Sequence, residues 1–96
     1  MAEVDPHPMG QEVEAQVEGR IRQVLAAHAQ LGVDVAELAV EADLYDAGMT
    51  SRASVNVMIG LETEFDVEFP DAMLRRDVFS SIAAMGRAIE ELLANA

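Results

Sequence analysis

Apolar side chains recur at every third or fourth position in three separate stretches of the chain, and this period constrains the fold more than any other feature. The rows are Val13, Val17, Ile21, Val24 or Leu25, and His28 in residues 11–31; Val57, Met58, Leu61 and Phe65 in residues 51–65; and Ile82, Met85, Ile89 and Leu92 near the end. Such spacing places the residues of each row on one face of an α-helix. Because aromatic and β-branched runs are scarce, the pattern predicts three main helices that bury these faces against one another.

The connecting segments complete an all-α fold, a small four-helix bundle of three main helices and one short helix, with a long first loop. In that loop, residues 32–49, we expect apolar side chains to pack under the bundle, namely Val33, Val35, Leu38, Leu44 and Tyr45. Phe65, Val67 and Phe69 alternate as in a strand, but a single strand has no partner, so an extended crossing segment is expected. Asp71 is expected to cap a short helix that runs to about Arg76 and turns Met73 and Leu74 inward, and Ser80 or Ser81 to cap the last helix.

The length of 96 residues fits one small domain. Pro6, Pro8 and Gly10 break any regular structure near the start, so residues 1–10 are expected to form a disordered tail. The folded domain is expected to span residues 11–96.

Charge and composition exclude several classes of function. Eighteen acidic residues stand against six arginines, which gives a net charge of −12. Such a charge disfavours nucleic acid and anionic membrane surfaces and favours basic patches on other proteins, although it also serves solubility. The absence of cysteine excludes disulfides and thiolate-based metal or redox sites. The first ten residues lack the basic end and apolar run of a secretory signal, and no stretch approaches the roughly 18 apolar residues of a membrane span, so a cytoplasmic protein is expected.

The stretch "YDAGMTSRAS", residues 45–54, places Ser51 at the start of the second predicted helix. Gly48 allows a sharp turn, and Thr50 or Ser51 can cap the helix. Free N–H groups and the positive end of the helix dipole favour a phosphate at this position. Ser51 is therefore suited to carry a phosphodiester, and an ordinary capping serine is the alternative interpretation.

A second row of side chains continues from Ser51 along the same helix. Val55 and Ile59 form this row, with Thr50, Arg52 and Asn56 beside it and Glu62 further along. An exposed apolar row rimmed by polar residues is typical of a docking surface. The alternative is a helix that buries both of its apolar rows.

Two other kinds of site fit the sequence poorly. Asp43 and Gly48 match the first and sixth positions of a calcium loop, but Tyr45, Ala47 and Ser54 occupy three of the remaining ligand positions, so too few oxygen ligands remain. A serine hydrolase needs a base beside Ser51, and only His7 and His28 exist. His7 lies in the predicted tail, His28 continues an apolar face where a core or boundary role is expected, and no glycine elbow surrounds Ser51. No enzymatic activity is therefore predicted.

The segment "DLYDAGMTSRASVNVMIGLETEFDVEFPD", residues 43–71, resembles the central helix of acyl and peptidyl carrier proteins. The positions in register with that family are Asp46, Gly48, Ser51, Leu61, Glu62, Glu64, Phe65, Asp66, Glu68, Pro70 and Asp71. The following "DVFSSIAAM" is similar to the family's approach to its last helix, and the resemblance extends over about residues 11–93.

The resemblance implies that a phosphopantetheinyl transferase joins 4′-phosphopantetheine from coenzyme A to Ser51. The thiol of this arm would hold an acyl or aminoacyl group as a thioester for delivery to a downstream acceptor enzyme. The family usually has Asp or His before the serine and Leu after it, whereas this chain has Thr50 and Arg52, and Ala53 replaces a frequent acid. These departures count against a housekeeping role in fatty-acid synthesis.

The motif "AGMTS" is similar to free-standing carriers that ligases related to the core of seryl-tRNA synthetases charge with amino acids. The resemblance implies such a ligase as a partner, with glycine or alanine as the usual cargo. An acyl carrier for a specialised fatty-acid or polyketide pathway is an alternative. An unmodified acidic protein-interaction module is another, from a different class.

Overall fold

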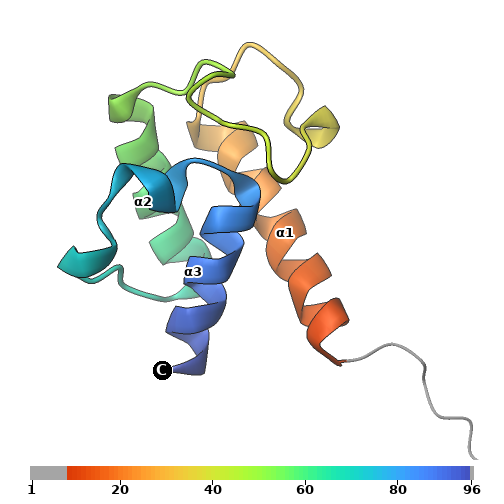
Figure 1. Cartoon of the computed structure of the whole chain (residues 1–96), viewed down its shortest axis with the longest axis vertical. Coiled ribbons are helices and arrows are strands. Elements are labelled where there is room, and N and C mark those ends of the chain that lie inside the picture. Colours follow the sequence, from red (N-terminus) through yellow and green to blue (C-terminus); the bar gives the residue numbers. More distant parts are fainter. Residues whose placement is uncertain (1–8, 96) are drawn as a thin grey trace, which may run out of the picture.

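The computed structural model describes residues 9–95, and every regular element in this range is helical. Three α-helices form the body: α1 (Met9–His28), α2 (Ser51–Phe65) and α3 (Ile82–Ala94). Three short 3-10 turns lie between them, η1 (Val35–Glu37), η2 (Asp71–Met73) and η3 (Arg76–Phe79). Figure 1 shows α1 packed beside both α2 and α3. The predicted all-α bundle is confirmed, and two 3-10 turns take the place of its short helix.

The helix boundaries follow the sequence signals closely for α2 and less closely for α1. The bounds of α2 are those predicted, whereas α1 begins at residue 9 and ends at residue 28, three residues before the predicted end. Residues 1–8 of the predicted tail lie outside the described residues, and residues 9 and 10 belong to α1.

The core is built from one face of each helix. The buried side chains of the helices are Val17, Ile21, Val24 and Leu25 of α1; Ala53, Val57, Leu61 and Phe65 of α2; and Ile82, Met85, Ala88 and Ile89 of α3. Met58 and Leu92 are half-buried and pack against this cluster. Of the two roles predicted for His28, the core role is wrong, because Ala29 takes the buried position at the end of α1 and His28 is exposed. His28 lies instead at the boundary of the core, beside Gly60 of α2. Within residues 15–95 no polar or charged side chain is buried.

The long first loop is fixed to the helices along its length. Leu44 is fully buried, and Val35, Leu38 and Tyr45 are half-buried, as predicted. Val33 departs from the prediction, since about half of its surface (48%) is exposed. Two main-chain hydrogen bonds tie the loop to the start of α3: Leu44 N donates to Ser80 O over 2.7 Å, and Ala83 N donates to Val40 O over 2.8 Å.

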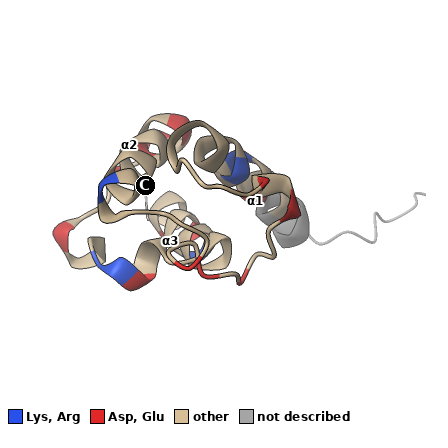
Figure 2. Cartoon of the chain, turned by 90° about the horizontal axis from the view of Figure 1, so that it is seen from above, with Lys and Arg blue, Asp and Glu red and all other residues tan. Residues whose placement is uncertain are grey.

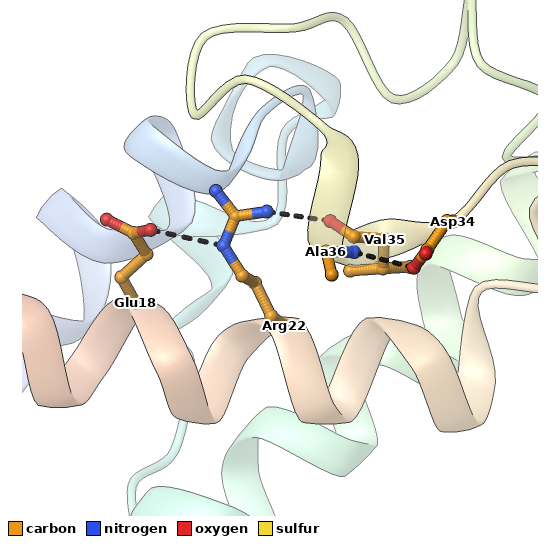
Figure 3. A network of polar contacts seen from close by, with 5 residues as sticks. All are labelled: Glu18, Arg22, Asp34, Val35 and Ala36. Carbon is orange, nitrogen blue, oxygen red and sulfur yellow. Dashed lines mark hydrogen bonds and ion pairs between the residues drawn. The ribbon is translucent and has the colours of Figure 1, made fainter.

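A half-buried arginine of α1 holds the first part of this loop (Figure 3). Arg22 Nη1 donates to Val35 O over 2.7 Å, and its Nε donates to Glu18 Oε2 over 3.1 Å. Asp34 caps η1, because its Oδ1 accepts from Ala36 N over 3.0 Å. The loop is therefore a defined structural segment that leads the chain to Ser51.

The segment after α2 crosses the bundle without forming a strand, as predicted. Asp66 ends α2 in the left-handed conformation (φ 54°), and Phe69 is buried with its ring centroid 5.2 Å from that of Phe79. Two details of the prediction are wrong. Pro70, not Asp71, occupies the cap position of η2 and makes no side-chain cap bond, because Asp71 is already the first residue of the turn. Leu74 is exposed (47%), because the chain leaves the turn at this residue, while Met73 packs against the core.

Candidate functional site

Ser51 is the first residue of α2, and its neighbour Thr50 is the residue that caps the helix. Thr50 has extended backbone geometry, and its Oγ1 accepts a hydrogen bond from Ala53 N over 3.0 Å. The cap is thus made without Ser51. Ser51 is exposed, and within residues 9–95 its hydroxyl makes no hydrogen bond.

The turn before α2 fixes the position from which Ser51 projects. Asp43 Oδ1 accepts from Tyr45 N over 2.9 Å, and Gly48 adopts a positive φ of 114° that a side chain would strain. Met49 then inserts into the core with 3% of its surface exposed, and its N–H donates to Leu44 O over 2.9 Å. A buried anchor two residues before Ser51 therefore holds the start of α2 against the bundle.

The free groups at this helix end suit a phosphate ester. Thr50 accepts from Ala53 N through its side chain and from Ser54 N through its carbonyl, over 2.9 Å in the second case. The amides of residues 51 and 52 lack such partners, since the first N–H groups of a helix have no intrahelical acceptor. The neighbouring hydroxyl of Ser54 is engaged, because it donates to Ser51 O over 2.6 Å. Only Ser51 therefore combines a free hydroxyl with the positive end of α2.

A groove of about 430 Å³ lies beside Ser51, between α2 and the segment that leads to α3. Its lining residues are Tyr45, Ser51, Ser54, Val55, Met58, Leu74, Arg75, Arg76 and Phe79. The Arg76 guanidinium carbon lies 3.6 Å from the centroid of the Tyr45 ring, and Tyr45 Oη donates to Arg76 O over 3.4 Å. This pair joins the first loop to η3, and both of its residues line the groove.

Sequence reasoning missed the far wall of this groove. The sequence pattern predicts a short helix for the segment that contains Leu74, Arg75 and Arg76, and packing under the bundle for Tyr45. It assigns none of these residues to the surroundings of Ser51. Two consecutive arginines in a chain that has six were an available signal. The pattern gives no indication that this segment folds back beside Ser51, because that position depends on tertiary packing.

The predicted docking row lies at the surface. Half of the surface of Val55 (50%) and of Ile59 (52%) is exposed, and Thr50, Arg52 and Asn56 are exposed as well. The alternative in which α2 buries both rows is excluded. Glu62 does not extend this surface, because it is half-buried and its Oε2 accepts from Phe69 N over 2.9 Å.

His28 is not part of the Ser51 groove. His28 lines a separate groove between α1 and α2, together with Asn56, Ile59 and Gly60. His7 lies outside the described residues. Among residues 9–95, no helix has both the length and the apolar composition that crossing a bilayer requires.

Comparison with known proteins gives consistent matches over most of the chain. Residues 20–89 match the family model described as phosphopantetheine attachment site. The aminoacyl carrier protein of Agrobacterium fabrum is 48% identical over 73 residues, which cover 76% of this chain and 88% of that protein. Aminoacyl carrier protein 1 of Bradyrhizobium diazoefficiens is 30% identical over 73 residues, which cover 76% and 81%.

Solved structures match the fold as well. One is a crystal structure of an engineered Bradyrhizobium japonicum glycine:[carrier protein] ligase complexed with carrier protein from Agrobacterium tumefaciens and ATP. A chain of that structure matches with a TM-score of 0.76 and 45% identity, over 78% of this chain and 97% of the matched chain. Another contains the Bradyrhizobium japonicum ligase complexed with glycylated carrier protein, with a TM-score of 0.66 and 30% identity, over 76% and 97%.

Proposed function

Because this chain belongs to the family of phosphopantetheine attachment domains, we propose that it is an aminoacyl carrier protein whose arm is joined to Ser51. We assign the carrier domain to the predicted residues 11–96, although α1 begins two residues earlier, at Met9; the matched region, residues 20–89, lies within this domain. The main structural support for the proposal is the hydrogen bonding of three neighbouring hydroxyl groups. Thr50 and Ser54 are engaged in hydrogen bonds of α2, whereas the exposed hydroxyl of Ser51 is free.

Attachment makes a phosphodiester at the Ser51 hydroxyl. The Ser51 oxygen bonds to the phosphorus next to the pantetheine part of coenzyme A, the nucleotide part leaves, and the hydroxyl proton passes to a base of the transferase. The free amides at the start of α2 and the helix dipole stabilise the negative charge at this position. The buried Met49 and the capping Thr50 keep this helix end in place during the encounter.

The bound arm supplies a thiol, which can hold an amino acid as a thioester. The chain contains no cysteine, so it offers no sulfur nucleophile of its own. The aminoacyl cargo is supported by the 48% identical aminoacyl carrier protein and by the similarity to a carrier protein complexed with glycine:[carrier protein] ligase and ATP. We therefore assign an ATP-dependent amino acid:[carrier protein] ligase as the loading partner and glycine as the first cargo to test.

Partners dock on the exposed row of α2, Val55 and Ile59, and on the exposed residues beside it, Thr50, Arg52 and Asn56. This row begins beside Ser51, so a protein bound to it lies within reach of the arm. The same row serves the phosphopantetheinyl transferase, the ligase and the downstream acceptor enzyme in turn. The protein acts in the cytoplasm, where ATP and coenzyme A are available for both charging steps.

Intact-mass measurement tests the attachment site. The purified chain is incubated with coenzyme A and a phosphopantetheinyl transferase, and the expected result is one phosphopantetheine increment on the peptide that contains Ser51. Ser51→Ala should abolish the increment without unfolding the protein. Ser54→Ala is the matched control, because Ser54 lies in the same turn and lines the same groove. It should be labelled like the wild type, because its hydroxyl is not the proposed attachment point.

The cargo is tested in a second step. The modified protein is given ATP, glycine and the Bradyrhizobium japonicum ligase, and the expected result is a further mass increment of one glycyl group that hydroxylamine removes, as it does for a thioester. Labelling of the Ser51→Ala variant would refute the attachment site. A modified wild-type protein that accepts acyl groups but no amino acid would refute the aminoacyl assignment.

A further inference from the structure

The charged residues that line the groove beside Ser51 are basic, although the chain as a whole is strongly acidic. The groove beside Ser51 is lined by Arg75 and Arg76 and by no carboxylate. Arg52, also exposed, lies in the first turn of α2 next to Ser51. Figure 2 shows basic positions (blue) on α2 and on the segment between α2 and α3, on the same side of the molecule, with acidic positions (red) next to them on that segment. Three of the six arginines of a chain with net charge −12 thus surround the attachment site.

The acidic residues of α2 point away from this site. Glu64 pairs with Arg20 of α1, with 2.8 Å between Oε2 and Nε, and Glu62 accepts from Phe69 N over 2.9 Å. From residue 51 to residue 61, Arg52 is the one charged residue of the helix. The docking row therefore has a positive charge next to Ser51, and the carboxylates of α2, Glu62 and Glu64, make internal contacts at the other end of the helix.

The two arginines of the groove wall are held in different ways. Arg76 stacks on the Tyr45 ring, which fixes its position while its side chain stays at the surface. Arg75 pairs with Asp77 over 3.2 Å, but the two side chains are 64% and 73% exposed, and such an exposed pair contributes little. Both guanidinium groups are therefore available to a docking protein.

Exposed apolar side chains lie on the same two segments as these arginines. Among the described residues five large hydrophobic side chains are exposed, and three of them, Val55, Ile59 and Leu74, are on α2 or on the facing segment. Val55 and Leu74 line the same groove, and Ile59 lies one helical turn beyond Val55. Together with Arg52, Arg75 and Arg76 they form one surface, here called the arginine-rimmed patch.

We propose that the loading ligase docks on the arginine-rimmed patch with an apolar surface that is flanked by carboxylates. The inference rests on the proposed function and specifies the chemistry of its partner. The net charge of −12 favours basic partners, but at physiological salt a charge acts only over about 8–10 Å, so the arginines next to the contact determine the preference. Arginine also forms paired hydrogen bonds to carboxylates and is enriched at interfaces.

The kinetics of glycine charging test whether the positive charge of this surface promotes docking. Wild-type and variant carriers are converted to the phosphopantetheine form, verified by mass, and charged by the Bradyrhizobium japonicum glycine:[carrier protein] ligase with ATP and glycine. For Arg52→Gln/Arg75→Gln/Arg76→Gln the KM for the carrier is expected to rise about tenfold while kcat changes less than about twofold, because docking and not chemistry is weakened. Raising the salt concentration should lower kcat/KM for the wild type and should not lower it for this variant.

Two control variants separate charge from structure. Arg87→Gln removes an exposed arginine of α3 that does not line the Ser51 groove, and its KM should stay within about twofold of the wild type. The corresponding triple lysine variant keeps the charges without the paired hydrogen bonds and without the stacking on Tyr45, so its kcat/KM should lie between those of the wild type and of the triple glutamine variant.

The sign of the change in KM decides the outcome. A triple glutamine variant with an unchanged or lower KM would overturn the inference, and a lower KM would indicate a basic partner surface. A wild-type carrier that is modified but takes up no glycine would instead refute the proposed cargo, and the inference with it.

Discussion

Replacing Gly60 by alanine is expected to destabilise this protein, although alanine is the better helix former. Gly60 lies in the middle of α2, where α1 crosses close to its backbone. A Cβ at this position would lie 2.8 Å from His28 Cδ2 and 2.9 Å from Val24 Cγ1. The exposed His28 ring can rotate away, but Val24 is 6% exposed and packed in the core. The close approach of the two helices therefore requires a glycine.

Two opposing terms set the size of the effect. Alanine in place of glycine inside a helix stabilises by about 1 kcal/mol. An extra carbon forced into a packed contact costs about 1–3 kcal/mol. The net expectation is a loss of about 1 kcal/mol, which lowers the Tm by about 4–8 °C in a domain of this size.

Thermal and urea denaturation followed by circular dichroism measure this change, with Gly86→Ala as the matched control. Gly86 is also inside a helix, α3, but a Cβ there would meet only Ile21 Cδ1 at 3.9 Å, an ordinary contact. Gly86→Ala should therefore stabilise by up to about 1 kcal/mol. The double variant Gly60→Ala/His28→Ala shows how much of the loss comes from the histidine ring. If Gly60→Ala stabilises as much as Gly86→Ala, the proposed close contact between α1 and α2 is wrong.

Two further predictions concern the ends of α2. Thr50→Ala removes the cap bond to Ala53 N and should lower the free energy of unfolding, measured in urea, by about 1 kcal/mol. Thr50→Ser keeps a capping hydroxyl and should retain most of the wild-type stability. Equal stability of the two variants would contradict the capping role of Thr50. Glu62→Ala leaves the Phe69 amide without its acceptor and should cost about 1–3 kcal/mol in the same assay, whereas Glu62→Gln keeps an acceptor oxygen and should cost less. A Glu62→Gln variant as unstable as Glu62→Ala would show that the carboxylate charge, not the acceptor, is what matters.

The α2 helix was predictable because its start and end carry local signals. Thr50 caps it through a bond that spans only three residues, and the apolar row that ends at Phe65 marks its last turn. Local spacing also placed Val55 and Ile59 on the exposed side, since the buried row Val57, Leu61 and Phe65 occupies the other face. The sequence alone left open whether Thr50 or Ser51 is the cap, because both types of side chain can accept the bond.

The wrong predictions share a different cause. His28 has the correct period for the core, but periodicity does not show how much of a side chain the neighbouring helix covers, and the His28 ring lies beside Gly60 of α2 while staying exposed. Leu74 was assigned to a helix that would have turned it inward, whereas the chain instead forms two separate 3-10 turns and exposes it. Glu62 had the position of a surface acid, and its bond to Phe69 N exists only because the chain reverses at Asp66. Each of these side chains is determined by contacts between segments.

The charge at the attachment site also depends on contacts between segments, and composition alone does not predict it. Composition gives a strongly acidic chain, and from that value alone a basic partner is the natural expectation. Folding brings Arg75 and Arg76 beside Ser51 because Val78 and Phe79 are buried immediately after them, which fixes this segment against the core. Stacking on Tyr45 then positions Arg76 over the first loop. The electrostatic potential at the docking surface therefore depends on which carboxylates make internal contacts and which arginines remain exposed beside Ser51. Net charge predicts neither of these two features.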